Sequence, residues 1–94
     1  MAHRVVWSLR AFHDLAAIAD YIAADSPAYS SVVIKNIVHL VRTLARFPRS
    51  GRKVPEFDDE TIRELHAYSY RIIYRVQPDE VVISAVIHGK RILQ

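Results

Sequence analysis

The chain has 94 residues, which is the length of one small domain, and we expect residues 1–94 to fold as a single domain. Hydrophobic residues make up 51% of the sequence and only two residues are glycine, which excludes an intrinsically disordered chain. The formal net charge is +3, and the absence of cysteine excludes disulfides and thiolate metal sites. No apolar run is long enough to span a bilayer, and the N-terminal residues lack the apolar core of a secretory signal, so we expect a cytoplasmic protein without a membrane partner.

The first half of the chain predicts one strand followed by a helical hairpin. The valine-rich segment His3–Ser8 is typical of a strand. Beyond it, apolar residues recur every three or four positions and predict an amphipathic helix, whose buried stripe is Leu9, Phe12, Leu15, Ile18, Ala19 and Ile22. Ser26 and Pro27 suit the cap and the first position of a second helix, which we expect to run to about Phe47. The tight connection predicts antiparallel helices, and the seam of the second helix is Val33, Ile37, Leu40, Leu44 and Phe47.

The second half predicts a loop followed by three strands. Pro48–Asp59 contains two prolines, a glycine and an acidic cluster, which is a loop composition. Strands are expected at Thr61–His66, Tyr70–Val76 and Val81–His88, the last two joined by a tight turn. The last strand is almost wholly apolar, which predicts an interior strand buried on both faces. The predicted fold is a two-layer α+β domain of βααβββ order, with the helical hairpin packed on a mostly antiparallel four-stranded sheet.

Positive charge is concentrated in the second half of the chain. The basic residues there are Arg49, Arg52, Lys53, Arg63, Arg71, Arg75, Lys90 and Arg91. In the third predicted strand, Tyr70 and Tyr74 share one face and are expected under the helices, while Arg71 and Arg75 share the other face, where they could track phosphates. Carboxylates are also frequent in this half, so an anionic partner and a solvated surface of ion pairs both remain open.

Four stretches of the sequence carry a resemblance to a known family. They are Asp14–Ile22; Phe47–Arg52 with Val54–Glu56; Ile62–Leu65; and Tyr70–Arg75 followed by Val86–Arg91. In order and spacing these stretches resemble the RelE/ParE toxins of type II toxin–antitoxin modules, and the resemblance covers nearly the whole chain. It implies a growth-inhibiting toxin that a cognate antitoxin neutralises in a hetero-oligomeric complex, with the antitoxin covering the helical hairpin and the sheet.

The RelE-like branch of the family cleaves mRNA on the ribosome. For that branch the resemblance places Glu56 as the base that activates the 2′-hydroxyl and Arg63 as the clamp on the phosphate. His88 is the candidate for the acid, because its ordinary pKa is near neutrality. The branch usually supplies the acid and a stacking ring close to the C-terminus, whereas this chain ends Gly89–Gln94 without such residues. The set of residues that RNA cleavage would need is therefore incomplete.

The ParE-like branch inhibits DNA gyrase without nuclease activity of its own, and the sequence resembles this branch more closely. The favoured interpretation is thus a binding protein and not an enzyme. Its implied target-binding residues are Arg63, Arg71, Arg75, His88, Lys90 and Arg91. Each could equally form an ion pair with Glu56 or Glu64.

A third interpretation is an inactive relative that still binds the antitoxin as a co-repressor. Neither it nor the two toxin interpretations calls for a cofactor. The five histidines show no spacing typical of metal ligands, so we expect no metal site.

Overall fold

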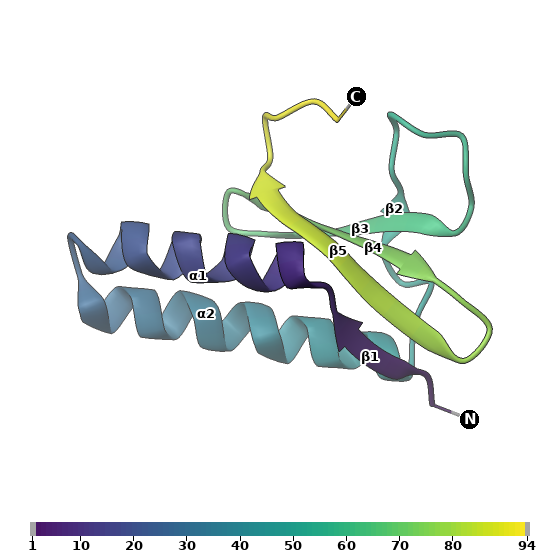
Figure 1. Ribbon diagram of the computed structural model, residues 1–94, viewed down its shortest axis with the longest axis horizontal. Helices are drawn as coiled ribbons and strands as arrows, with labels where there is room; N and C mark the ends of the chain where they lie inside the picture. Colours follow the sequence, from purple (N-terminus) through teal and green to yellow (C-terminus); the bar gives the residue numbers. More distant parts are fainter. Residues whose placement is uncertain (1, 94) are drawn as a thin grey trace.

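Two antiparallel helices pack on one face of a five-stranded sheet in the computed structural model, which describes residues 2–93 (Figure 1). The chain forms β1 (Arg4–Trp7), α1 (Leu9–Ala23), α2 (Pro27–Arg42), a single 3-10 turn η1 (Thr43–Ala45), β2 (Arg52–Lys53), β3 (Ile62–Ala67), β4 (Tyr70–Val76) and β5 (Glu80–His88). This arrangement confirms the predicted α+β class, the helical hairpin and the approximate positions of four strands. Within residues 2–93, neither helix combines the length and the apolar character that crossing a bilayer requires.

Both helices begin at a serine cap. The Ser8 hydroxyl oxygen accepts the backbone N–H of Ala11 at 3.0 Å, and that of Ser26 accepts the N–H of Tyr29 at 3.2 Å, with Pro27 in the first turn as predicted. The second helix ends earlier than expected, at Arg42 and not near Phe47. Its end tightens into the 3-10 turn because carbonyls at a helix C-terminus lack α-helical partners.

The strand order in the sheet is β1-β5-β4-β3-β2. β1 lies parallel to β5, and every other neighbouring pair is antiparallel. The prediction of four strands was wrong by one, because β2 lies inside the segment expected to be a loop. Two residues are too few to produce a periodic pattern, and β2 exists through its pairing with Arg63 and Glu64 of β3.

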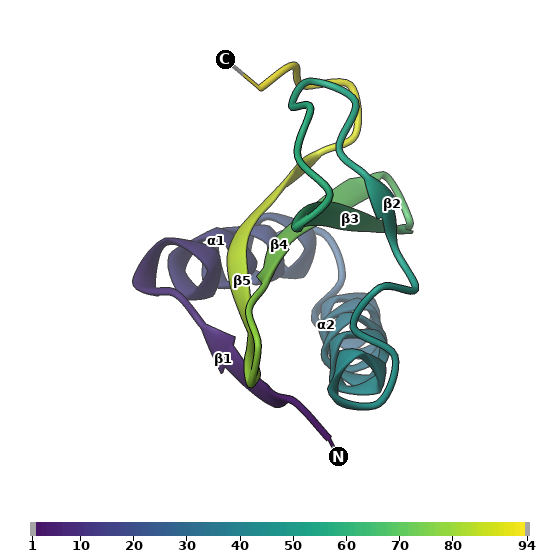
Figure 2. The ribbon, with the colours of Figure 1, turned by 90° about the vertical axis from the view of Figure 1, so that its right-hand side faces the viewer.

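The sheet carries a separate apolar cluster on each face. On the helix side, β4 and β5 contribute Ile72, Tyr74, Val76, Val81, Ile83 and Val86, with Tyr70 packed against them. On the opposite side, which we call the second face, the cluster is Val54, Ile73, Ala85 and Ile87, with Phe57, Ile62 and Leu93 against it. Since β5 contributes to both clusters, the prediction of an interior strand buried on both faces is confirmed, as is the placing of both tyrosines under the helices. Figure 2 shows the β2–β3 loop and the C-terminal segment beside one another beyond the sheet.

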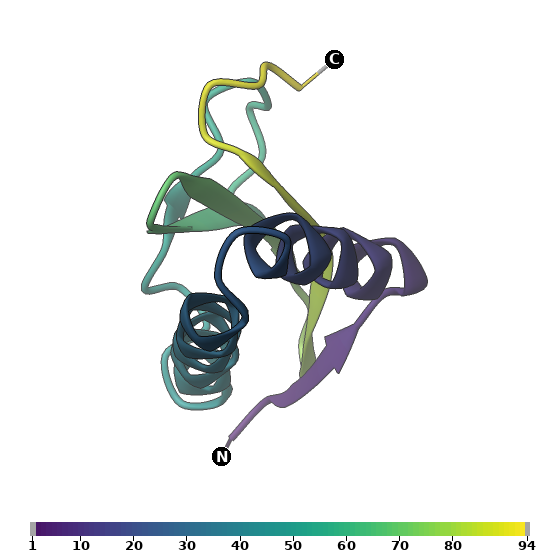
Figure 3. The same cartoon turned by 90° about the vertical axis from the view of Figure 1, so that its left-hand side faces the viewer.

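The buried stripe of α1 agrees with the predicted stripe at Leu15, Ile18 and Ile22 and departs from it only in the first turn. Leu9 and Phe12 are 73% and 59% exposed, whereas Ala11 is fully buried and Ile18 nearly so. One turn after Ala11, the Asp14 carboxylate accepts the backbone N–H of Val86 at 3.0 Å, which ties the start of the helix to β5. Figure 3 shows α2 nearly end-on and α1 obliquely, both beside the sheet. The predicted seam of the second helix likewise stops before Phe47, which is 59% exposed.

Candidate functional site: an ion-pair network beneath a basic surface

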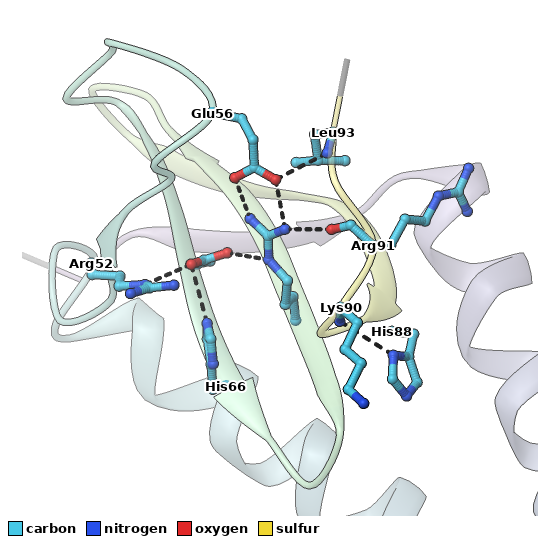
Figure 4. A network of polar contacts seen from close by, with 9 residues as sticks. Arg52, Glu56, His66, His88, Lys90, Arg91 and Leu93 are labelled. Carbon is cyan, nitrogen blue, oxygen red and sulfur yellow. Dashed lines mark hydrogen bonds and ion pairs between the residues drawn. The ribbon is translucent and has the colours of Figure 1, made fainter.

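Glu64 is the buried centre of a polar network on the second face. Its side chain has no exposed surface and faces the same side as Ile73, its register partner on β4. One carboxylate oxygen accepts Arg71 Nε at 2.6 Å; the other accepts Arg52 Nε at 2.6 Å and lies 3.1 Å from His66 Nε2 (Figure 4). Three elements, β2, β3 and β4, therefore converge on one carboxylate.

Arg71 links Glu64 to the β2–β3 loop and to the C-terminal segment. Its side chain is 5% exposed, and its Nη1 and Nη2 donate to the two carboxylate oxygens of Glu56, both at 2.7 Å. Nη1 also donates to the carbonyl of Arg91 at 2.7 Å. Glu56 in turn accepts the backbone N–H of Leu93 at 2.9 Å (Figure 4). Every nitrogen of the guanidinium thus donates to an intramolecular partner.

The hydrogen bonds of the network favour the charged forms of Glu56, Glu64 and Arg71. Hydrogen bonds from Arg71 and from the Leu93 N–H lower the pKa of Glu56 from its ordinary 4.5 to about 2. For Glu64, burial acts to raise the pKa, but the hydrogen bonds from His66, Arg71 and Arg52 together outweigh it and the pKa is lowered. The hydrogen bond to Glu56 is the largest cause of the raised pKa of Arg71. Glu56 and Glu64 are therefore anions at neutral pH, and the network holds two negative charges close to three positively charged or protonatable groups.

The low pKa of Glu56 predicts an acid-dependent loss of stability. Between pH 4.5 and about 2 the unfolded chain binds this proton and the folded chain does not, so the free energy of unfolding falls as the pH falls. The contribution of Glu56 is complete above that window and absent below it. We therefore expect the stability difference between the wild type and Glu56→Gln to shrink across the window in urea titrations followed by circular dichroism. A difference that stays constant with pH would contradict this prediction, and Asp58→Asn, a change at a fully exposed carboxylate of the same loop, is the control.

Basic side chains are exposed on the surface above this network. We call this surface the basic end and define it by Arg52, His66, His88, Lys90 and Arg91, all of which are exposed. Two adjoining hollows of about 370 Å³ each lie here, one flanked by His66 and His88 and the other by Arg52 and Arg91. The hollows meet at Gly89 and Lys90. A surface of this charge attracts anions such as phosphates or acidic side chains.

The structure separates the residues considered for RNA cleavage. Arg63 and Glu64 are neighbours on β3, so their side chains point to opposite faces, and Arg63 lies on the helix side opposite Tyr74. The Arg63 guanidinium donates to the carbonyl of Gly51 at 2.8 Å and to the Glu60 carboxylate at 3.0 Å. Glu56 lies on the second face. Arg63 and Glu56 thus do not face a common space.

The remaining predicted residues fall into separate groups. His88, Lys90 and Arg91 come together at the basic end, with the His88 Nδ1 accepting the backbone N–H of Lys90 at 3.2 Å. Arg71 lies buried beneath them and pairs with Glu56 and Glu64, where the alternative to target binding was an ion pair at the surface. Arg75 is exposed farther along the second face of β4, where its positive charge helps to lower the pKa of Asp59.

Sequence reasoning missed Arg52 and His66 as members of the site. His66 was detectable, since the two-residue period places it on the face of Glu64 and the hairpin register places it opposite Arg71. Arg52 was not detectable, because it reaches Glu64 from the unpredicted strand β2. Among residues 2–93, no three His, Asp or Glu side chains are grouped so as to hold a metal ion.

The protein is a small two-layer α+β domain, and its basic end is an anion-attracting surface at one end of the sheet. Residues 5–93 match the family described as "ParE toxin of type II toxin-antitoxin system, parDE". The chain belongs to this family and is a type II toxin–antitoxin toxin of the ParE/RelE superfamily. The resemblance seen in the sequence is thereby confirmed at the level of the superfamily.

Relatives of known name or structure agree with this assignment. Toxin RelE2 of Caulobacter vibrioides is 34% identical over 90 residues, which cover 95% of this chain and 98% of the relative. The chromosomal ParDE toxin–antitoxin system of P. aeruginosa contains a chain with a TM-score of 0.77 and 23% identity, covering 95% of this chain and 98% of that one. A chain of the RelBE2 toxin–antitoxin complex of Mycobacterium tuberculosis gives a TM-score of 0.67 at 22% identity, with coverages of 94% and 99%. These two structures share the fold of this chain.

Proposed function

We propose that this toxin inhibits DNA gyrase by binding, through its basic end, and that a cognate antitoxin neutralises it in the cytoplasm. The observation that carries the proposal is the ion pair in which both carboxylate oxygens of Glu56 accept hydrogen bonds from the Arg71 guanidinium. A carboxylate whose pKa is about 2 is a weak base at neutral pH, and Arg63 faces the other side of the sheet. Glu56 and Arg63 are held in intramolecular ion pairs, whereas His88, Lys90 and Arg91 are exposed.

The experiment has two arms, both run with purified protein free of antitoxin. The first arm measures supercoiling and DNA cleavage by gyrase over a range of toxin concentrations. The second arm probes mRNA for cuts in a translating extract, and the RelE2 name of one relative is the reason to include it. Inhibited gyrase with intact message is the expected result. Message cuts with unaffected gyrase would overturn the proposal in favour of a ribosome-dependent endoribonuclease.

Removing charge from the basic end should weaken the inhibition. For Lys90→Ala combined with Arg91→Ala, we expect the toxin concentration that halves gyrase activity to rise roughly tenfold, and to rise less at high salt, since both cations would contact an anionic surface. The matched control is Lys35→Ala with Arg42→Ala, which removes the same charge from exposed positions of α2. Equal effects of the two double substitutions would show that only net charge matters and not the basic end.

The helical hairpin offers an apolar surface for the proposed antitoxin. Leu9, Phe12, Tyr21, Tyr29 and Val32 are between 51% and 78% exposed, so these side chains are accessible to a partner. Expression of the chain with and without its antitoxin tests this part of the proposal. Growth arrest only in the absence of antitoxin is expected; normal growth with soluble, folded protein would favour an inactive relative retained as a co-repressor.

A further inference from the structure

The C-terminal segment after β5 is fastened to the sheet through its main chain. The Gly89 N–H donates to the carbonyl of Ser69 at 2.7 Å, the Arg91 carbonyl accepts Arg71 Nη1 at 2.7 Å, and the Leu93 N–H donates to Glu56 at 2.9 Å. The Leu93 side chain adds an apolar contact with the cluster on the second face. A segment without regular secondary structure thus has three main-chain attachments within five residues, residues 89–93.

Two of these attachments come from the buried ion pair and none from the charged side chains of the segment. Lys90 and Arg91 are exposed, and neither side chain pairs with a carboxylate among residues 2–93. Their positions therefore follow from where the main chain is held. Figure 4 shows Glu56 and the guanidinium that it binds beside the segment that carries these two cations.

We propose that Glu56 and Arg71 are positioning residues, which clasp residues 89–93 to the sheet and so present Lys90 and Arg91 to the target. This inference rests on the proposed function of the basic end. A clasped segment loses little conformational freedom on binding, whereas a free segment would have to be ordered at that moment. The clasp therefore raises affinity without touching the target.

The first test measures the clasp itself. Trypsin cuts after lysine and arginine, and the release of the terminal peptide after Lys90 or Arg91 can be followed by mass spectrometry. Glu56→Gln removes the negative charge and replaces one of the two carboxylate oxygens by an NH2 group. These oxygens accept the N–H groups of Arg71 and Leu93 in the wild type. We expect this release to become roughly tenfold faster, while cutting at internal sites changes little, since local opening of an end is separable from global unfolding. Asp58→Asn, in the same loop, should release the peptide at the wild-type rate.

The second test asks whether Glu56 acts through the two cations. If it does, Glu56→Gln weakens gyrase inhibition in the wild-type background but adds little once Lys90 and Arg91 are alanine, because non-additive effects mark residues that act together. An independent effect of Glu56→Gln in the alanine background would overturn the positioning role. This readout distinguishes positioning from a general loss of stability, which would add in both backgrounds.

The inference and the proposed function fail in different ways. A wild-type protein that leaves gyrase unaffected refutes the function, whatever the proteolysis shows. Unchanged release of the terminal peptide in Glu56→Gln refutes the clasp, whatever gyrase shows. Should Glu56→Gln fail to fold, Leu93→Pro removes one clasp donor from the segment and leaves the ion pair intact, and faster release is again required.

Discussion

Glu64→Gln should lower the free energy of unfolding by about 3 to 5 kcal/mol, because it removes one partner from a buried ion pair. The side chain of Glu64 has no exposed surface, and that of Arg71 is only 5% exposed. With glutamine at this position, one charged partner of Arg71 is lost, and the new amide group brings N–H donors towards Arg52 and Arg71. The total free energy of unfolding of a domain is about 5 to 15 kcal/mol, so this substitution would remove much of it.

The measurement is chemical unfolding at neutral pH, followed by circular dichroism. The matched control is Asp58→Asn, a carboxylate change at a fully exposed position, for which no measurable loss is expected. A loss below about 1 kcal/mol for Glu64→Gln would mean that water or Glu56 alone satisfies Arg71, and the central role of Glu64 would be wrong.

Gly51→Ala should destabilise the fold by about 3 kcal/mol through a steric clash. A Cβ atom at Gly51 would overlap the carbonyl oxygen of Glu64 and lie 2.6 Å from the Tyr74 hydroxyl oxygen. Neither atom can move away easily, since the first belongs to a paired strand and the second belongs to a fully buried ring. The same substitution also disturbs the 2.9 Å hydrogen bond from the Gly51 N–H to that hydroxyl.

Gly89→Ala provides the comparison for this prediction. Its Cβ atom would lie 3.2 Å from the Ser69 carbonyl oxygen, a close contact that a small shift relieves. Thermal unfolding of both variants should therefore give a large decrease in Tm for Gly51→Ala and a small one for Gly89→Ala. Similar decreases would argue against the close approach of the β2 region to β3 and β4.

The composition and periodicity of the sequence predicted most of the secondary structure. The Ser26 cap, the proline at the start of α2 and the apolar run of β5 are local signals, and each gives its element directly. The errors arose where tertiary contacts override local pattern. In the first turn of α1, Ala11 is buried in place of Leu9 and Phe12, and β2 consists of two residues that only their pairing with β3 makes a strand.

The candidate site was predictable in part. The face shared by Arg71 and Arg75 followed from strand alternation, and the pairing of Arg71 with Glu56 and Glu64 was one of two alternatives that the charges left open. The sequence alone could not choose between a buried ion pair and an exposed phosphate contact, because burial depends on what covers the strand. Here the covering elements are the β2–β3 loop and the C-terminal segment.

By itself, the sequence determined the α+β class, the helical hairpin, the interior position of β5 and the membership of the toxin superfamily. Local propensity and apolar periodicity determine the first three features, which require only neighbouring residues, whereas the membership followed from the resemblance of four stretches of the sequence. The tertiary structure alone decided that Arg63 and Glu56 lie on opposite sides of the sheet and that Arg52 joins Glu64. These relations depend on strand register and on contacts between residues distant in the chain, and a shift of one residue would have reversed every face.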